Sequence, residues 1–157
     1  MGRPSRLVKV VFDAPTVLYR IGLGWMLGKR ILVLTHRGRR TGQLRETVLE
    51  VLLFDPDNKE SLVVSAYGTQ ADWYRNLRVQ PALRVRTGRM DYVPEQRFLT
   101  ADETREAAIE FSHRHPWEAR LVPKVLPAIG AAVPRNSDSG PVDLLASLPM
   151  VAFRPKN

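Results

Sequence analysis

Residues 31–54, ILVLTHRGRRTGQLRETVLEVLLF, carry the clearest evidence for the fold. Residues 31–35 are apolar and predict a buried strand, and residues 46–54 predict another, because both of its faces are apolar apart from Glu50. The GRRTG segment between them predicts a tight turn, because Gly38 and Gly42 can adopt backbone angles that other residues avoid. The stretch therefore predicts a central hairpin of a β-sheet.

The rest of the chain adds short strands, turns and helices to this hairpin. Asp55-Pro56-Asp57-Asn58 predicts a turn, and Thr100 with Glu103 forms the capping-box pattern that begins a helix. Further strands are predicted at residues 61–66, 83–87, 90–98 and 149–153, helices at 71–78, 100–115 and 117–128 (the last interrupted by Pro123 and Pro127), and a loop at 131–141. This order predicts a mainly β, α+β architecture: a mostly antiparallel barrel of five to six strands with peripheral helices.

The composition is that of an ordinary globular domain. The chain has 157 residues, so we expect residues 1–157 to form one domain, with an N-terminal helical segment at residues 6–28. The absence of cysteine excludes a disulfide framework and thiolate metal sites and suits a reducing compartment. The first residues lack the pattern of a secretory signal, so we expect a cytoplasmic protein. The helical segment could also contact the inner face of the membrane. The sequence is compatible with either a monomer or a homodimer.

Positive charge is concentrated in one part of the sequence. The net charge is +8, and the segment from Ala14 to Arg45 has no acidic residue. Its basic residues are Arg20, Lys29, Arg30, Arg37, Arg39, Arg40 and Arg45. The partner of this segment should be an anion, such as a phosphorylated cofactor, nucleic acid or an acidic membrane surface.

The turn itself, THRGRRTGQLR from Thr35 to Arg45, carries groups that suit phosphate oxygens. Arginine guanidinium groups donate paired hydrogen bonds, Thr41 adds a hydroxyl, and the glycines expose backbone N–H groups. It is not a Walker A loop, since the GK[ST] ending is missing and no helix follows. The alternative reading is a solvated hairpin tip.

The segments LTHRGRRTGQLRETVLEV and LVVSAYGTQADWYRNLRVQPALRVRTG together resemble the actinobacterial-type deazaflavin (coenzyme F420)-dependent nitroreductase family. The family pattern runs approximately T-x-x-G-R-[KR]-[ST]-G-x-x-R, then a strand, then W-Y-x-N-L-x-x-x-P. The resemblance covers about residues 31–98 and implies a split β-barrel, a fold of flavin and deazaflavin oxidoreductases. It also implies coenzyme F420 as cofactor, a phosphorylated deazaflavin with a polyglutamate tail.

The resemblance also implies roles for individual residues. The basic turn would face the cofactor's phosphate and tail carboxylates, the strand after it would approach the ring, and a loop and a short helix would close the other side. In this sequence the residues so assigned are, for the turn, Arg39, Arg40, Thr41 and Arg45; for the strand, Thr47 and Val48; for the loop, Ser65, Ala66, Tyr67 and Gly68; and for the helix, Trp73 and Asn76.

Departures from the family pattern bear on the acceptor. Characterised nitroreductases use a loop serine and C-terminal tyrosines, whereas here Ala66 stands at the expected serine position and no tyrosine follows Tyr92. We therefore expect hydride transfer from reduced deazaflavin to an apolar electron-poor acceptor, such as a quinone, enone, nitro compound or unsaturated lipid, with quinones and enones preferred. Tyr67 is the candidate catalytic proton donor.

Two alternatives come from the same residues. A basic turn accepts any phosphate, so an FMN-binding split-barrel oxidoreductase would present the same motif. The basic segment would also suit a non-catalytic binder of anionic lipid or nucleic acid, although no nucleic-acid-binding motif is present and we expect no nucleic acid partner. His36, His113 and His115 are too scattered to form a metal triad, so no metal site is expected.

Overall fold

The computed structural model describes residues 29–134 and 138–157, and the predicted helical segment at residues 6–28 lies outside them. The strands are β1 Ile31–Arg37, β2 Leu44–Asp55, β3 Glu60–Val64, β4 Arg84–Thr87, β5 Met90–Tyr92, β6 Pro94–Phe98 and β7 Met150–Pro155. The helices are η2 Gly68–Gln70, a short 3-10 helix, and α2 Asp72–Val79, α3 Ala101–Arg114, α4 Pro116–Ala128 and α5 Pro141–Ala146.

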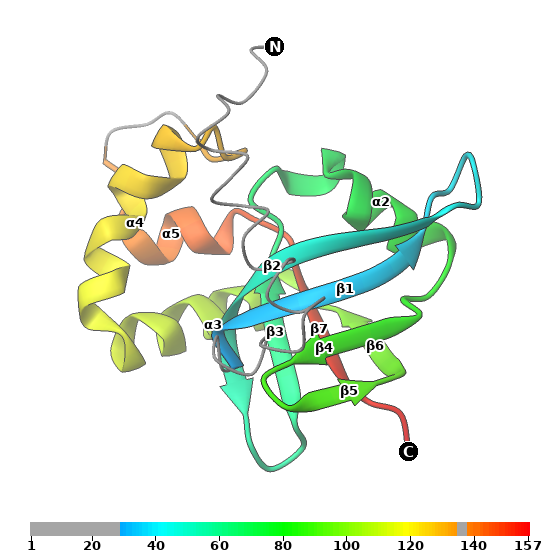
Figure 1. Cartoon of the computed structure of the whole chain (residues 1–157). Helices are drawn as coiled ribbons and strands as arrows, with labels where there is room; N and C mark the ends of the chain where they lie inside the picture. The colour runs from blue at the N-terminus through cyan, green and yellow to red at the C-terminus, as the bar shows by residue number, and fades with distance from the viewer. Residues whose placement is uncertain (1–28, 135–137) are drawn as a thin grey trace.

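The strands form one antiparallel sheet that curls into a nearly closed barrel. Its order is β5-β4-β1-β2-β3-β7-β6, so β5 and β6 stand at the two edges. These two strands are consecutive in the chain and separated by Val93 alone, and this bend joins the edges of the barrel (Figure 1). The predicted split β-barrel is confirmed, with seven strands among the described residues where the sequence predicted five to six. The additional strand arises because residues 90–98, predicted as one strand, divide at Val93.

The long hairpin β1–β2 that the sequence predicted is present, and its register is regular. Ile31 pairs with Glu50, and the ladder continues without interruption to Arg37 opposite Leu44. Strand β2 therefore begins at Leu44, earlier than predicted, because its first residues pair with the polar end of β1. The hairpin turn projects from one end of the barrel, beside α2 (Figure 1).

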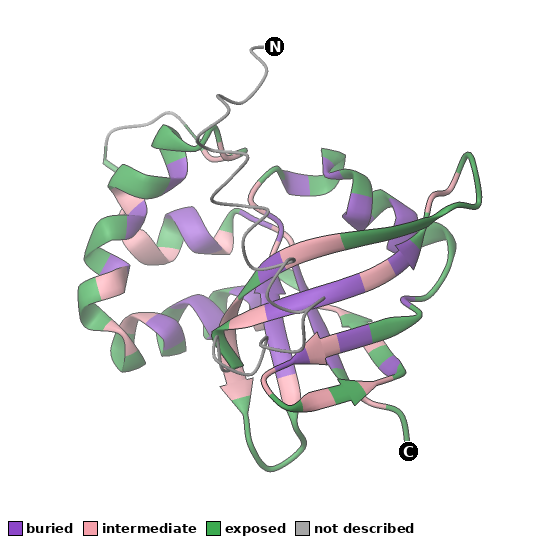
Figure 2. Ribbon diagram, viewed as in Figure 1, coloured by how far each residue is buried: buried purple, intermediate pink, exposed green. Residues whose placement is uncertain are grey.

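The core has two parts, which lie on the two faces of β7. Val151 and Phe153 point into the barrel and pack with Trp73 and Tyr74 of α2, while Met150 and Ala152 point outward. The outward residues pack against α3, α4 and α5, which form a layer on one side of the barrel (Figure 1). Alternate side chains of a strand point to opposite faces, so β7 is buried on both faces from Met150 to Phe153, where it is covered on both sides (Figure 2).

Two helical segments differ from the sequence predictions. Helix α4 continues through Pro123 and Pro127, where an interruption was expected, because Val122 and Leu126 hold its inner face against the core. Helix α5 begins at Pro141 and was not predicted. Its residues Leu144 and Leu145 are buried between α3, α4 and the sheet, and six residues are too few to give a helical period in the sequence.

Candidate functional site

The turn between β1 and β2 is closed by its own backbone. The N–H of Gly38 donates to the carbonyl oxygen of Gln43 at 2.8 Å, and the N–H of Gly42 donates to that of Gly38 at 2.8 Å. Gly42 has a φ of +68°, in the left-handed region that favours glycine. A Cβ atom on Gly38 would lie 2.9 Å from Oγ1 of Thr41, so glycine lets the turn fold closely over that hydroxyl.

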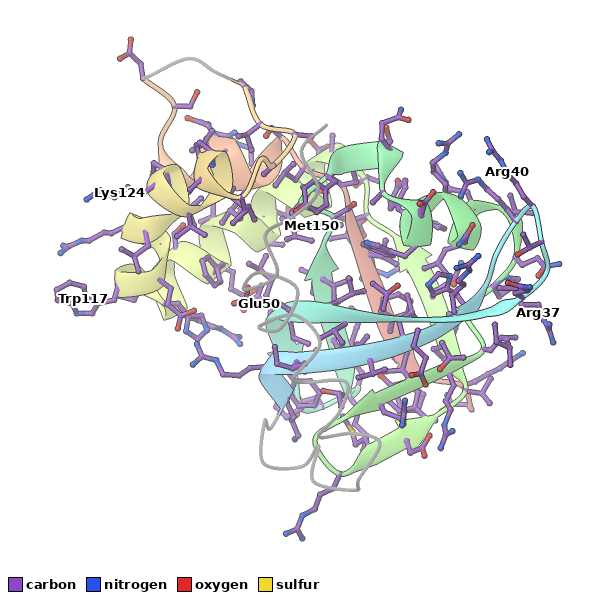
Figure 3. The ribbon with its side chains drawn as sticks, turned by 45° about the horizontal axis from the view of Figure 1, so that its top comes forward. Arg37, Arg40, Glu50, Trp117, Lys124 and Met150 are labelled. Atoms are coloured by element: carbon purple, nitrogen blue, oxygen red, sulfur yellow. The ribbon has the colours of Figure 1, made fainter. Side chains whose placement is uncertain are left out.

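Three arginines of this hairpin expose their side chains to solvent. Arg37 and Arg40 extend from the hairpin end of the molecule, at the opposite end from Trp117 and Lys124 of α4 (Figure 3). Arg37 donates to the carbonyl oxygen of Gly42 at 3.0 Å, and Arg45 is the second residue of β2. Within residues 29–134 and 138–157, no carboxylate forms an ion pair with Arg37, Arg40 or Arg45. The hairpin therefore offers cationic groups without an internal counterion.

Arg39 differs from these three because it is held by α2. Its backbone N–H donates to Oδ1 of Asn76 at 3.0 Å, and its Nη1 donates to the same oxygen at 2.9 Å and to Asp72 at 3.1 Å. Only 17% of the Arg39 side chain is exposed. The guanidinium group thus fixes the turn to the helix.

His36, the residue before Arg37, is buried at the junction between the hairpin and α2. Its Nδ1 lies 3.1 Å from Nδ2 of Asn76, and its Nε2 lies 2.9 Å from Oγ1 of Thr47. Burial lowers the pKa of His36 below its ordinary value of 6.5, and Arg45 lowers it further, while Asp72 acts in the opposite direction. The imidazole is therefore neutral at pH 7.

Sequence reasoning considered His36 only as a metal ligand and missed this arrangement. A histidine between a buried strand and a basic turn is a weak signal by itself. Its partner Asn76 lies 40 residues further along the chain. A buried polar side chain needs hydrogen-bond partners, and that argument could have directed attention to both residues.

The loop assigned to the deazaflavin, residues 65–68, packs against the end of α4. The hydroxyl of Ser65 is fully buried and donates to the carbonyl oxygen of Gly68 at 2.6 Å, so it shapes the loop. The backbone of Ala66 accepts a hydrogen bond from Ala132, and the phenol of Tyr67 donates to the carbonyl oxygen of Ile129 at 3.3 Å. Tyr67 is 54% exposed and reachable from solvent.

The predicted site residues are only partly brought together. The network of the hairpin joins Arg39, Asn76 and Thr47 through His36, with Arg40, Thr41 and Arg45 on the same hairpin. Val48 follows Thr47 on a strand, so the two side chains point to opposite faces. Trp73 packs within the barrel core and stacks edge to face on Tyr74. The hydrogen bonds of the loop at residues 65–68 lead to α4, away from the turn.

A cavity of about 270 Å³ lies elsewhere, between the barrel and α3. None of the predicted site residues lines it. Five of its lining residues are acidic: Asp55, Glu60, Glu103, Glu106 and Glu110. Only Arg97 and Arg114 among its lining residues are basic, so its electrostatics disfavour an anionic ligand. The exposed arginines of the hairpin suit an anion better than this cavity does.

Two further findings concern the described part of the chain. There, His, Asp and Glu side chains nowhere gather in threes with the geometry of a metal site. None of the helices described has the length and apolar character needed to cross a membrane.

The model of the F420H2-dependent quinone reductase family matches residues 10–115, which is more than half of the chain. The chain belongs to this family of oxidoreductases. The match extends over the first six strands, β1 to β6, and over α2 and α3. It confirms the resemblance to F420-dependent enzymes drawn from the turn and the WYRNL segment. Comparison with curated protein sequences gave no significant match.

Solved structures show the same fold at low sequence identity. One, described as an F420-H2 dependent reductase (FDR-A), is 17% identical with a TM-score of 0.50 and covers 81% of this chain and 96% of its own. A structure described as a domain-swapped dimer has the same identity and TM-score and covers 89% and 99%. An FMN-binding protein related to pyridoxamine 5′-phosphate oxidase, from Nostoc punctiforme, is 16% identical with a TM-score of 0.50 and covers 98% and 81%.

The residues of the hairpin fit the cofactor of this family. Coenzyme F420 carries a phosphate and several carboxylates, and the hairpin presents exposed guanidinium groups that no carboxylate of the described chain neutralises. The hydroxyl of Thr41 accepts a hydrogen bond from the N–H of Gln43, which leaves its own proton available for an anion oxygen. The donor set is that of an anion site.

Proposed function

We propose that this protein transfers a hydride from reduced F420 to an apolar quinone-like or enone acceptor. The observation that carries the proposal is the joint presence of the family match and a hairpin whose exposed arginines have no internal counterion among the described residues. When bound, the reduced deazaflavin supplies the hydride, which is the redox chemistry that amino-acid side chains lack. The chain supplies binding, orientation and a proton.

Arg40 and Arg45 would bind the phosphate and tail carboxylates, with Arg37 and the Thr41 hydroxyl as further donors. Arg39 would act indirectly, because its guanidinium group is engaged by Asn76 and Asp72. The hydrogen bonds of Arg39 to Asn76 hold the hairpin turn to α2, so binding should cost little ordering of the backbone. This preorganisation favours binding of a large flexible anion.

Reduction of a quinone to a hydroquinone consumes one hydride and one proton. Tyr67 is our candidate for the proton donor, because its phenol is exposed at the loop assigned to the deazaflavin. The carbonyl oxygen of Ile129 accepts a hydrogen bond from the phenol and thereby orients the hydroxyl group. Replacement of Tyr67 by Phe should lower turnover and leave F420 affinity unchanged if the phenol is the donor, whereas an unchanged rate would assign the proton to water.

The acceptor preference rests on the residues that nitroreductases use and this chain lacks. A polar nitro group must be held beside the hydride donor, and here Ala66 stands in the loop where a serine is expected. An apolar quinone or enone needs mainly orientation and one proton.

The cofactor is tested by parallel binding titrations with F420 and FMN, using Lys124→Ala as a charge-matched control far from the hairpin (Figure 3). Selective F420 binding supports the proposal, and selective FMN binding replaces it with a flavin enzyme of the same fold. The acceptor is then tested by following oxidation of F420H2 with menadione, cyclohexenone and a bicyclic nitroimidazole at equal concentrations. A nitroimidazole rate well above the other two would contradict the preference, and no turnover with any acceptor would contradict the enzyme assignment.

A further inference from the structure

A continuous chain of polar groups crosses the junction between the hairpin and α2, and its donors and acceptors can be assigned one by one. It runs from Arg39 through Asn76 and His36 to Thr47. His36 and Asn76 are 3% and 5% exposed, so water does not substitute freely for either partner. A buried network of this kind is stable only when every donor faces an acceptor.

The side-chain amide of Asn76 can have only one orientation in this network. Its Oδ1 lies 3.0 Å from the backbone nitrogen of Arg39 and 2.9 Å from Nη1 of the same residue. Both of those groups can only donate, so the atom facing them must be the amide oxygen. The amide nitrogen of Asn76 therefore faces His36, and it donates to the imidazole.

The state of His36 follows from that donor. Its Nδ1 receives a hydrogen bond from Asn76 and cannot itself carry a proton. The neutral imidazole then carries its proton on Nε2. The charged groups around it are Arg45 on β2, Asp72 on α2 and Arg39 in the turn, and burial together with Arg45 opposes a second proton.

The last link fixes the hydroxyl of Thr47. Nε2–H of His36 donates to Oγ1 of Thr47 at 2.9 Å, so that oxygen uses a lone pair toward the histidine. The hydroxyl proton must point elsewhere, and the described residues provide no acceptor for it. Thr47 is only partly buried, and Arg45 lies two residues before it on the same face of β2.

We propose that His36 is a positioning residue that makes the Thr47 hydroxyl a fixed hydrogen-bond donor to an acceptor oxygen of the bound cofactor. The inference rests on the proposed function, because it takes the hairpin as the cofactor site. A threonine hydroxyl ordinarily rotates, whereas here the Nε2–H of His36 occupies one lone pair and turns the hydroxyl proton away from the histidine. Thr47 thereby selects a ligand group with a lone pair, such as a carbonyl, phosphate or carboxylate oxygen.

The first experiment needs no cofactor. Nitrogen-detected NMR of the free protein with labelled histidine reports which ring nitrogen carries the proton, and the His36→Gln variant assigns the signal. We expect the Nε2–H tautomer at pH 7. A proton on Nδ1, or a charged imidazole at that pH, would overturn the proposal whatever the cofactor is.

The second experiment measures F420 affinity in matched variants. Thr47→Val keeps the shape and removes the donor, and His36→Leu removes the group that orients it, so each should weaken binding about tenfold, the loss of one hydrogen bond. Thr47→Ser keeps the donor, and His36→Gln can accept from Asn76 through Oε1 and donate to Thr47 through Nε2, so both should bind as the parent does. Thermal unfolding checks that every variant is folded.

The outcomes separate the two proposals. If the parent binds F420 and Thr47→Val binds equally well, the donor role of Thr47 is wrong and the proposed function stands. If His36→Gln is as weak as His36→Leu, the orienting role of the histidine is wrong. A parent protein that does not bind F420 overturns the proposed function, and with it the ligand assigned to Thr47.

Discussion

Adjacent arginines in the turn have the same side chain and different roles. Arg39 is held by Asn76 and Asp72, whereas Arg40 is exposed and has no carboxylate partner among the described residues. Sequence reasoning assigned both to the cofactor. It could not separate them, because the groups that engage Arg39 lie 33 and 37 residues further along the chain.

Single substitutions should distinguish these two arginines. Arg40→Ala should weaken F420 binding by about 1.5 to 3 kcal/mol, the loss of one charge-assisted contact, and leave the free energy of unfolding within about 0.5 kcal/mol of the parent. Arg39→Ala should lower the free energy of unfolding by about 1 kcal/mol, because it removes the hydrogen bonds of the guanidinium group to Asn76 and Asp72 of α2. Binding titrations and urea unfolding measure the two effects. Equal F420 affinity in Arg40→Ala and the parent would reduce the turn to a solvated hairpin.

His36 should make stability depend on pH. Its pKa in the folded protein lies below the ordinary value of 6.5, so at intermediate pH the unfolded chain binds more protons than the folded protein. The stabilisation is complete above about pH 6.5 and is lost as the pH falls from there toward the pKa of the folded state. His36→Gln should reduce this pH dependence, as measured by urea unfolding at pH 7.5 and pH 5. His113→Gln, at an exposed histidine of α3, is the control and should leave it unchanged.

At the level of elements, α2 holds the turn through Asn76 and is itself attached to the barrel wall. The side chain of Gln96 on β6 bridges the end of this helix: it donates to the carbonyl oxygen of Leu77 at 3.1 Å and accepts from the N–H of Ala82 at 2.8 Å. Both partners are backbone groups at the point where α2 ends. Gln96 therefore anchors to the barrel wall the helix that carries Asn76.

Removal of the Gln96 amide should loosen that anchor. Gln96→Met keeps most of the side-chain volume and leaves two partly buried backbone groups without their partner, which should lower the free energy of unfolding by about 1 to 3 kcal/mol. Gln80→Ala changes an exposed glutamine just beyond α2 and should have little effect. Urea unfolding measures both. Equal stability of Gln96→Met and the parent would show that core packing alone positions the helix.

Most helices and strands could be predicted from the sequence. Which strands pair and which helices pack against one another could not. The sequence predicted helix 71–78 and the structure has Asp72–Val79, because Pro81 marks where a short amphipathic helix must end. The same sequence contains no local signal that β3 pairs with β7. Helix α5 was not predicted because it is stabilised by packing against α3 and α4. These contacts join residues far apart in the chain, so a short segment of sequence does not reveal them.

For the whole molecule, exposed arginines of the hairpin and the acidic residues of the cavity lie in different places. The net charge alone does not show this. The net charge is +8, and Arg37 and Arg40 of the hairpin lie at one end of the molecule (Figure 3). Acidic residues line the cavity beside α3. The sequence itself shows the basic segment. It gave no indication that carboxylates from β2, β3 and α3 would gather at a different place.

This separation predicts that F420 affinity depends strongly on salt. Exposed guanidinium groups attract an anion at long range, and the attraction is screened over about 10 Å at 0.1 M salt. Each such contact is worth about 1 kcal/mol in a water-like medium, so raising NaCl from about 0.05 to 0.5 M should weaken binding roughly tenfold. The double variant Arg40→Ala, Arg45→Ala should flatten this dependence, and Lys124→Ala, at the opposite end of the molecule, should preserve it.

The ligand provides the complementary control for the salt prediction. A deazaflavin riboside that lacks the phosphate and tail has no anionic groups for the hairpin to attract, so its affinity should be lower and nearly independent of salt. If the riboside and F420 showed the same dependence, salt would be acting on the protein and not on the contact. If F420 affinity were flat across the range, the exposed arginines would not be the anion site. A steep dependence for F420 that disappears both in the double variant and with the riboside would place the phosphate or tail at the hairpin.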